Sequence, residues 1–162
     1  MAANSARIAV AVLSGRCVRV QTQIDIACPP EVVFDYVTTP ALWHRWHPAT
    51  VAVLGVPTRP LVAGETALEV FAVGGRRDKA LWTVLACNPP HQWEIATDTA
   101  SGSARIVYQL TPIADGSRFD RTLEFRSKHW LWRSLDSTLT RWILKRQSAT
   151  ALHNLKSVLE RP

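Results

Sequence analysis

The sequence predicts a single small α+β domain, in which a curved antiparallel sheet of about seven strands wraps around one long C-terminal helix and encloses an apolar pocket. Segments that alternate apolar and polar residues recur at roughly ten-residue spacing with short polar turns, which is typical of an antiparallel meander. Two short helical segments follow the first strand. The last part of the chain changes to the three- and four-residue apolar spacing of a helix.

The first strand is predicted at residues 18–26, where every second residue from Val20 onward is apolar or a threonine. Cys28-Pro29-Pro30 ends it. A helix is expected at residues 31–37, because proline suits the first helical turn and the Glu31 carboxylate suits the positive end of the helix dipole. A second short helix is expected at residues 41–46.

Six further strands follow in the predicted order, separated by turn residues such as Gly74-Gly75 and Asp115-Gly116. They are residues 51–54, 66–73, 79–87, 92–99, 104–111 and 117–126. Strands this closely spaced pair with their neighbours in sequence.

A long helix is predicted from about residue 131 to 159, a length of roughly 43 Å that would cross a whole sheet. Its apolar stripe is Leu131, Leu135, Leu139, Trp142, Ala149, Leu152, Leu155 and Leu159. Its polar side carries Arg133, Arg141, Lys145, Arg146 and Lys156. A bent sheet facing such a helix cannot close its core everywhere, so a ligand pocket is expected between the two layers.

Composition favours a globular, cytoplasmic protein. The apolar fraction is 47%, and no window approaches the 18 or more apolar residues of a membrane-spanning helix. The net charge of +6 is spread along the chain without a dense basic run, which disfavours nucleic acid as the partner. Three widely separated cysteines fit reduced thiols. Residues 17–162 are expected to form the domain, and residues 1–16 a leader, an extra strand or a disordered segment.

Four stretches of the chain resemble the SRPBCC superfamily, the helix-grip group that includes START lipid-transfer domains, pollen-allergen-type proteins and polyketide cyclases. They are residues 24–37 with the Pro-led helix, residues 40–48 with Trp43 and Trp46, residues 82–90 ending in Pro-Pro, and residues 154–160. The bacterial cyclase/dehydrase-type branch is the most similar in character. The resemblance implies a helix-grip fold over residues 18–160 and gives weak guidance on function, because this fold carries many activities.

Arg121 is the most informative candidate for the pocket. On the strand 117–126 it shares the apolar face with Phe119 and Leu123, and an inward arginine must be paired or wet. It could hold a carboxylate or enolate oxygen of a ligand, with Glu69 or Tyr108 nearby. Two alternatives stay open, namely a bulge that turns Arg121 to solvent and a structural pair with a carboxylate. The pattern around Glu69 does not decide which face of the sheet it occupies.

The second short helix offers aromatic and histidine candidates. Trp43 and Trp46 could stack on a planar ligand or act as a core lid. His44 and His47 have the spacing of a metal pair, but no third ligand follows, so no metal is predicted. The full set of candidate ligand-binding residues is Trp43, Trp46, His47, Glu69, Phe71, Trp82, Tyr108, Arg121, Leu123, Leu135, Leu139 and Trp142.

Three functions are compatible with this pattern. The first is binding or transport of a small hydrophobic molecule of lipid, polyketide or isoprenoid type. The second is a cyclase- or dehydrase-type enzyme, in which Arg121, Glu69, Tyr108 or His47 would move protons. The third is an interaction module that uses the basic face of the long helix. Nucleotide-binding, α/β-hydrolase and zinc-protease motifs are absent from the sequence, and no cofactor is predicted.

Overall fold

The computed structural model describes residues 17–161 except 74, 101 and 129–136. Its strands are β1 (Cys17–Ile26), β2 (Thr50–Leu54), β3 (Thr66–Val73), β4 (Arg76–Asn88), β5 (Gln92–Asp98), β6 (Gly102–Ile113) and β7 (Gly116–Ser127). Its helices are α1 (Pro30–Thr38), the 3₁₀ turn η1 (Pro40–Leu42), α2 (Trp43–Trp46) and α4 (Ser137–Leu159). The element order agrees with the prediction from the sequence.

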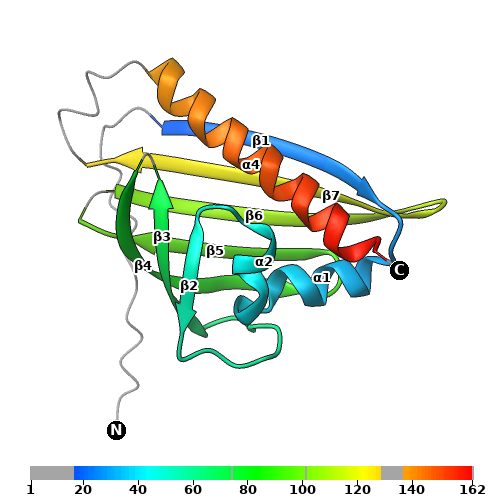
Figure 1. Cartoon of the computed structure of the whole chain (residues 1–162). Coiled ribbons are helices and arrows are strands. Elements are labelled where there is room, and N and C mark those ends of the chain that lie inside the picture. The colour runs from blue at the N-terminus through cyan, green and yellow to red at the C-terminus, as the bar shows by residue number, and fades with distance from the viewer. Residues whose placement is uncertain (1–16, 74, 101, 129–136, 162) are drawn as a thin grey trace, which may run out of the picture.

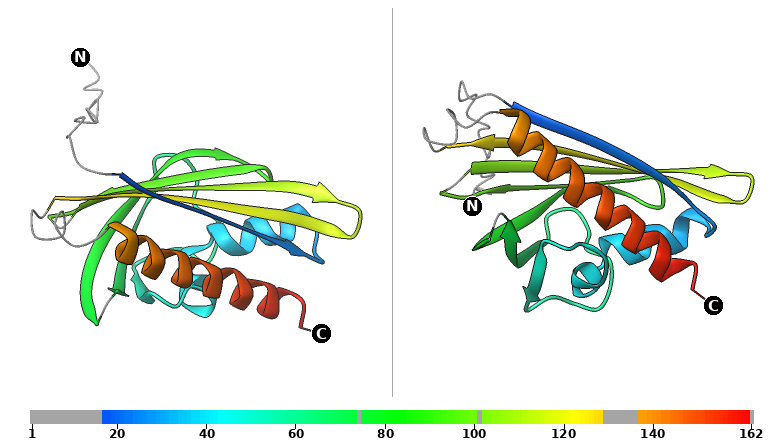
Figure 2. Two further views of the ribbon diagram at one scale, coloured as in Figure 1. Left: turned by 90° about the horizontal axis from the view of Figure 1, so that it is seen from above. Right: turned by 45° about the horizontal axis from the view of Figure 1, so that its top comes forward.

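The strands form one antiparallel sheet in the order β1-β7-β6-β5-β4-β3-β2 (Figure 1). All the described helices lie on the same side of this curved sheet, with α4 running across it and α1 and α2 beside its C-terminal part (Figure 2). The predicted α+β helix-grip fold is therefore confirmed. Because the strands curl toward the helices, side chains from distant strands converge on the inner face of the sheet.

Strand β1 shows why the alternation predicted the fold well. Its even-numbered residues are the less exposed ones throughout, and Val20 and Ile26 are fully buried. Helix α1 begins with proline in its first turn and buries Val33, Phe34 and Val37, the three apolar positions of its pattern. Burying these side chains stabilises each by roughly 1.5–3 kcal/mol relative to exposure.

The β6–β7 hairpin is closed by Gly116, which has a φ of 146°. A Cβ atom at this position would lie 2.1 Å from the carbonyl oxygen of Ile26. Only glycine therefore allows β7 to start so close to the end of β1. The pairing of β7 with β6 and β1 then runs without a register shift from Ser117 to Arg126.

Helix α4 packs on the sheet with a face that only partly matches the predicted stripe. Leu152 and Leu155 are buried as expected, together with Ser148. Leu139 and Trp142, in contrast, are 50% and 56% exposed. At 100° per residue these two positions lie about 120–180° away from Ser148 around the helix, so the apolar stripe spirals off the inner face. The predicted residues Leu131 and Leu135 lie outside the described residues.

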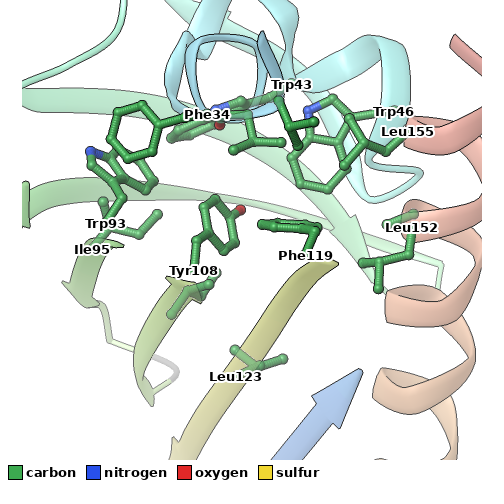
Figure 3. Packing of buried hydrophobic residues seen from close by; sticks show 14 of the residues in the cluster. Phe34, Trp43, Trp46, Trp93, Ile95, Tyr108, Phe119, Leu123, Leu152 and Leu155 are labelled. Carbon is green, nitrogen blue, oxygen red and sulfur yellow. Dashed lines mark hydrogen bonds between the residues drawn. The ribbon is translucent and has the colours of Figure 1, made fainter. Parts of the chain in front are cut away.

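Aromatic side chains fill the core between the sheet and the short helices (Figure 3). Tyr108 stacks on Trp93 with ring centroids 5.5 Å apart and meets Phe119 edge-on at 5.1 Å. Trp46 reaches Tyr108 from α2 at 6.3 Å. Such offset and edge-to-face pairs contribute about 0.5–1.5 kcal/mol beyond area burial. In the described part of the chain, no helix is both long and apolar enough to cross a membrane.

Candidate ligand-binding site

Polar side chains gather on the inner face of the sheet, where apolar residues are expected. We name them the inner polar cluster. Its members come from five strands, α4 and the segment that follows α2, and they are His47, Thr50, Glu69, Trp82, Tyr108, Arg121 and Ser148. A buried polar group is stable only when its hydrogen bonds are satisfied, so the contacts of each member show what the cluster still lacks.

Arg121 is the only cation of this cluster and is 3% exposed. Its Nη1 donates to the Ser148 hydroxyl at 2.8 Å, and its Nη2 lies 3.4 Å from His47 Nε2. No carboxylate oxygen of the described residues lies within 4.0 Å of the guanidinium, and its buried Nε has no hydrogen-bond partner there. The alternative that turns Arg121 to solvent is therefore wrong, and among the described residues a carboxylate, Glu69, interacts with it only at more than 4.0 Å.

Glu69 also points to the inner face, which settles the orientation that the sequence left open. It is 7% exposed, and its two oxygens accept hydrogen bonds from the Thr50 hydroxyl and, at 2.7 Å, from Trp82 Nε1. Burial raises the pKa of this carboxyl, while the two hydrogen bonds and the charge of Arg121 act in the opposite direction. The site therefore holds a carboxyl group that is harder to ionise than usual.

His47 and Tyr108 complete the chemistry around the guanidinium. Burial and the neighbouring Arg121 cation lower the pKa of His47 to about 3, so the ring is neutral at physiological pH. Tyr108 is the direct cross-strand neighbour of Arg121. Burial raises the pKa of its hydroxyl, although the charge and a hydrogen bond of Arg121 partly oppose this. Both side chains are therefore neutral groups beside a buried positive charge.

Two donors of the cluster have no partner among the described residues. They are Arg121 Nε and His47 Nδ1. Because His47 Nε2 faces an Arg121 N–H, it acts as the acceptor, and the proton of the neutral ring belongs on Nδ1. An unsatisfied buried donor costs about 1–3 kcal/mol. The inner polar cluster therefore has spare donors and a positive charge, which suits an acceptor oxygen or an anion.

The structure brings most of the sequence-predicted site residues to the interior. Trp43, Trp46, Trp82, Tyr108 and Leu123 are buried on the inner side, and Phe71 packs partly buried against them. Trp43 donates to a backbone carbonyl of α1, and so it acts as part of the core there. Leu139 and Trp142 are not brought to the inner polar cluster, and Leu135 lies outside the described residues.

Two members of the cluster were missed from the sequence. Ser148 is a polar residue on the inner face of α4, at four- and seven-residue spacing from Leu152 and Leu155. That spacing was a usable signal. Thr50 is the first residue of β2, and its role depends on Glu69 facing inward, which no local pattern reveals.

The two histidines do not share a face as a metal pair requires. His44 is exposed, whereas His47 follows the end of α2 and turns toward Arg121. A separate surface hollow is lined by Ala27, Cys28, Pro29, Pro30, Asp115 and Gly116. It contains no member of the inner polar cluster, so we do not place the candidate site there.

Comparisons with known proteins agree with this fold. Residues 18–160 match the model of the family described as "Polyketide cyclase / dehydrase and lipid transport", and the chain therefore belongs to this family. No curated protein matches the sequence significantly.

Solved structures similar to this chain are distant in sequence. A START superfamily protein from Mycobacterium smegmatis is 11% identical with a TM-score of 0.73, over 88% of this chain and 97% of that one. A putative uncharacterized protein from Rhizobium leguminosarum is 14% identical with a TM-score of 0.71, over 92% and 98%. The di-domain ARO/CYC BexL from the BE-7585A biosynthetic pathway is 17% identical with a TM-score of 0.70, over 90% of this chain and 51% of that one. These similarities establish the fold.

Proposed function

We propose that the protein binds a small, mostly apolar molecule between the sheet and α4, and that Arg121 holds an anionic or strongly accepting oxygen of that molecule. The observation that carries this proposal is the buried guanidinium with an unpartnered Nε and no carboxylate within 4.0 Å among the described residues. A ligand oxygen would supply the close partner that this Nε lacks.

The energetics favour a ligand over a purely structural role. Moving a cation out of water costs several kcal/mol, and its neutral partners Ser148, His47 and Tyr108 return only part of it. A charge-assisted hydrogen bond to the guanidinium contributes about 1.5–3 kcal/mol. A ligand oxygen at Nε would therefore be recognised by a group that is already oriented and desolvated.

The surroundings of the cluster suit an apolar ligand body. Leu123 on β7, together with Leu152 and Leu155 on α4, presents aliphatic surface on both layers (Figure 3). Sites for small molecules combine such walls with a few convergent polar groups. The family description also includes lipid transport, which is consistent with a carrier of fatty-acyl, polyketide or isoprenoid type.

The test has two stages. Native mass spectrometry of freshly purified protein, followed by denaturing extraction, would detect and identify a co-purifying molecule. Titration would then compare a long-chain fatty acid with the alcohol of the same chain length. Tighter binding of the acid is expected, because only the acid presents a carboxylate to Arg121.

Arg121→Met is the decisive variant, with Arg19→Met as its control. Arg19 is 64% exposed on the outer side of β1, so its loss should leave binding unchanged. Arg121→Met is expected to weaken the acid roughly 10- to 150-fold while leaving the alcohol nearly unaffected. Equal losses for both ligands, or no loss, would remove Arg121 from the site.

A cyclase- or dehydrase-type activity is the second candidate, and the raised pKa of both Glu69 and Tyr108 favours it. A protonated carboxyl beside a fixed cation can give a proton to an oxygen whose developing negative charge Arg121 stabilises. The family description includes cyclases and dehydrases. In this scheme Arg121 binds the enolate or carbonyl oxygen, and Glu69 or Tyr108 transfers the proton.

The Glu69→Gln variant distinguishes the binding function from the enzymatic function. The amide keeps the shape and an acceptor oxygen but cannot exchange a proton at neutral pH. If the protein is an enzyme, Glu69→Gln should retain affinity for a 1,3-diketone ligand and lose its cyclisation or dehydration. Unchanged turnover would exclude Glu69 as the proton donor, and absence of turnover in the wild type would leave the binding function alone.

A further inference from the structure

Helix α4 carries a positively charged surface that takes no part in the inner polar cluster. Its 23 residues from Ser137 to Leu159 include no Asp or Glu. Arg141, Lys145 and Arg146 are all exposed, and none has a carboxylate within 4.0 Å among the described residues. An uncompensated group of cations on one helix attracts an anionic partner.

Large apolar side chains stand beside these cations. Leu139 and Trp142 are 50% and 56% exposed, and three residues of separation make them neighbours on the helix surface. The Arg146 guanidinium carbon lies 5.5 Å from the centroid of the Trp142 ring. Exposed tryptophan and leucine next to basic residues are characteristic of helices that lie at a membrane interface.

We propose that this face of α4, formed by Leu139, Trp142, Lys145 and Arg146, docks the protein on an anionic membrane surface. The cations face the lipid headgroups, and Trp142 and Leu139 enter the boundary between headgroups and acyl chains. The helix lies on the membrane without crossing it, since no described helix meets the length and apolarity of a spanning segment.

The observations favour a membrane over nucleic acid. Single-stranded nucleic acid stacks its bases on open aromatic faces. Arg146 already lies over the Trp142 ring, and Leu139 offers a base no stacking surface. A lipid interface accepts both apolar side chains and the cations together.

The N-terminal half of α4, which carries the proposed docking face, also lies close to the inner polar cluster. Arg141 lies two helical turns before Ser148 on nearly the same side of the helix, yet Arg141 is exposed and Ser148 is buried. Docking at this end would bring the inner polar cluster close to a reservoir of apolar molecules. Only this use of the docked state depends on the function proposed above, and the docking itself does not.

Vesicle co-sedimentation of the full chain tests the proposal. The probes are vesicles of phosphatidylcholine alone and of equal parts phosphatidylcholine and phosphatidylglycerol, at low and at high salt. The wild type is expected to bind only the anionic vesicles and to dissociate at high salt, because screening shortens the reach of the charges. Equal binding to both kinds of vesicle, or to neither, would overturn the proposal.

Variants locate the surface. Each cation contributes about fivefold to anionic-membrane affinity, so Lys145→Gln/Arg146→Gln should lower binding roughly 25-fold. The control is Arg77→Gln/Arg126→Gln, which removes the same charge from exposed positions on the sheet. A control that loses as much binding as the α4 variant would show general charge attraction and refute the assigned face.

Insertion has its own readout. The chain contains seven tryptophans, so quenching by brominated lipid is compared between the wild type and Trp142→Phe. A large fall in quenching is expected in the variant, and equal quenching would refute insertion of Trp142. Tighter binding of a single-stranded RNA oligonucleotide than of the anionic vesicles would reassign the face to nucleic acid. Arg121→Met should sediment like the wild type, which separates docking from the ligand proposal.

Discussion

Replacing Arg121 by methionine is expected to remove ligand binding without a large loss of stability. The change removes a buried charge and keeps a side chain of similar length. A buried charge that is stabilised mainly by a ligand destabilises the folded protein when no ligand is bound. A charge in a structural pair stabilises the folded protein with or without a ligand. The free energy of unfolding therefore separates the two roles.

The magnitude follows from the contacts. Removing the buried guanidinium relieves its desolvation cost, for which we take about 1–4 kcal/mol, the range for replacing a buried ion pair or triad by hydrophobic side chains. The same change leaves the Ser148 hydroxyl, which is 2% exposed, without its donor, at a cost of about 1–3 kcal/mol. Arg121→Met alone should thus lie between about 2 kcal/mol below and about 3 kcal/mol above the stability of the wild type, and adding Ser148→Ala should raise stability by about 1–3 kcal/mol.

Urea unfolding of the ligand-free protein, followed by circular dichroism, measures these differences. Arg19→Met is the matched control, and its effect should stay within about 0.5 kcal/mol because that side chain is exposed. A loss of 3–5 kcal/mol in Arg121→Met, with no recovery in the double variant, is what breaking a buried structural pair produces. That result would refute the assignment of Arg121 to a ligand.

Three further predictions concern pH and backbone geometry. The pKa of His47 falls from 6.5 to about 3 on folding, so protonation of the ring opposes the folded state below pH 6.5. The wild type should therefore lose up to about 5 kcal/mol of stability relative to His47→Asn as the pH falls from 6.5 toward 3, as measured by urea unfolding across that range. Glu69 has the opposite pH dependence, because folding raises the pKa of its carboxyl. The stability of the wild type relative to Glu69→Gln should therefore fall as the pH rises above 4.5, by at most about 1.4 kcal/mol per pH unit. Parallel pH profiles of the two proteins would contradict this. Gly116→Ala should cost more than about 2 kcal/mol because its Cβ would meet the Ile26 carbonyl, whereas Gly64→Ala, with positive φ but open space, should cost only about 1 kcal/mol in the same denaturation assay.

The order and boundaries of the elements follow from local physical chemistry, which explains their agreement with the structure. In β1 the period-2 alternation gives the correct face because one side of the strand is solvated. The Pro-led start of α1 and the turn at Gly116 depend on backbone preferences within a few residues. Such signals need no knowledge of the rest of the chain.

The long helix shows where a pattern is insufficient. The residues Leu139 and Trp142 extend the apolar spacing toward the start of α4, yet they stay exposed while Ser148 is buried. Apolar spacing identifies a helix, but Leu139 and Trp142 lie about 120–180° around α4 from Ser148 and so point away from the sheet. Which side of the helix packs on the sheet is decided by the tertiary contacts.

The sequence by itself determined the class of fold and the family resemblance, because alternation along one strand and the order of turns are local properties. It put Arg121 on the apolar face of its strand but left open a bulge that would turn the side chain to solvent, and the structure settled this by burying Arg121. The tertiary structure decided that Glu69 faces inward and that it shares an interior with Arg121, Tyr108, His47 and Ser148. Glu69 is on β3 and Arg121 is on β7, and three strands (β4, β5 and β6) lie between them in the sheet. Only the curvature of the sheet and the helix packed across it bring such side chains into one buried site, and no pattern within a single strand encodes that approach.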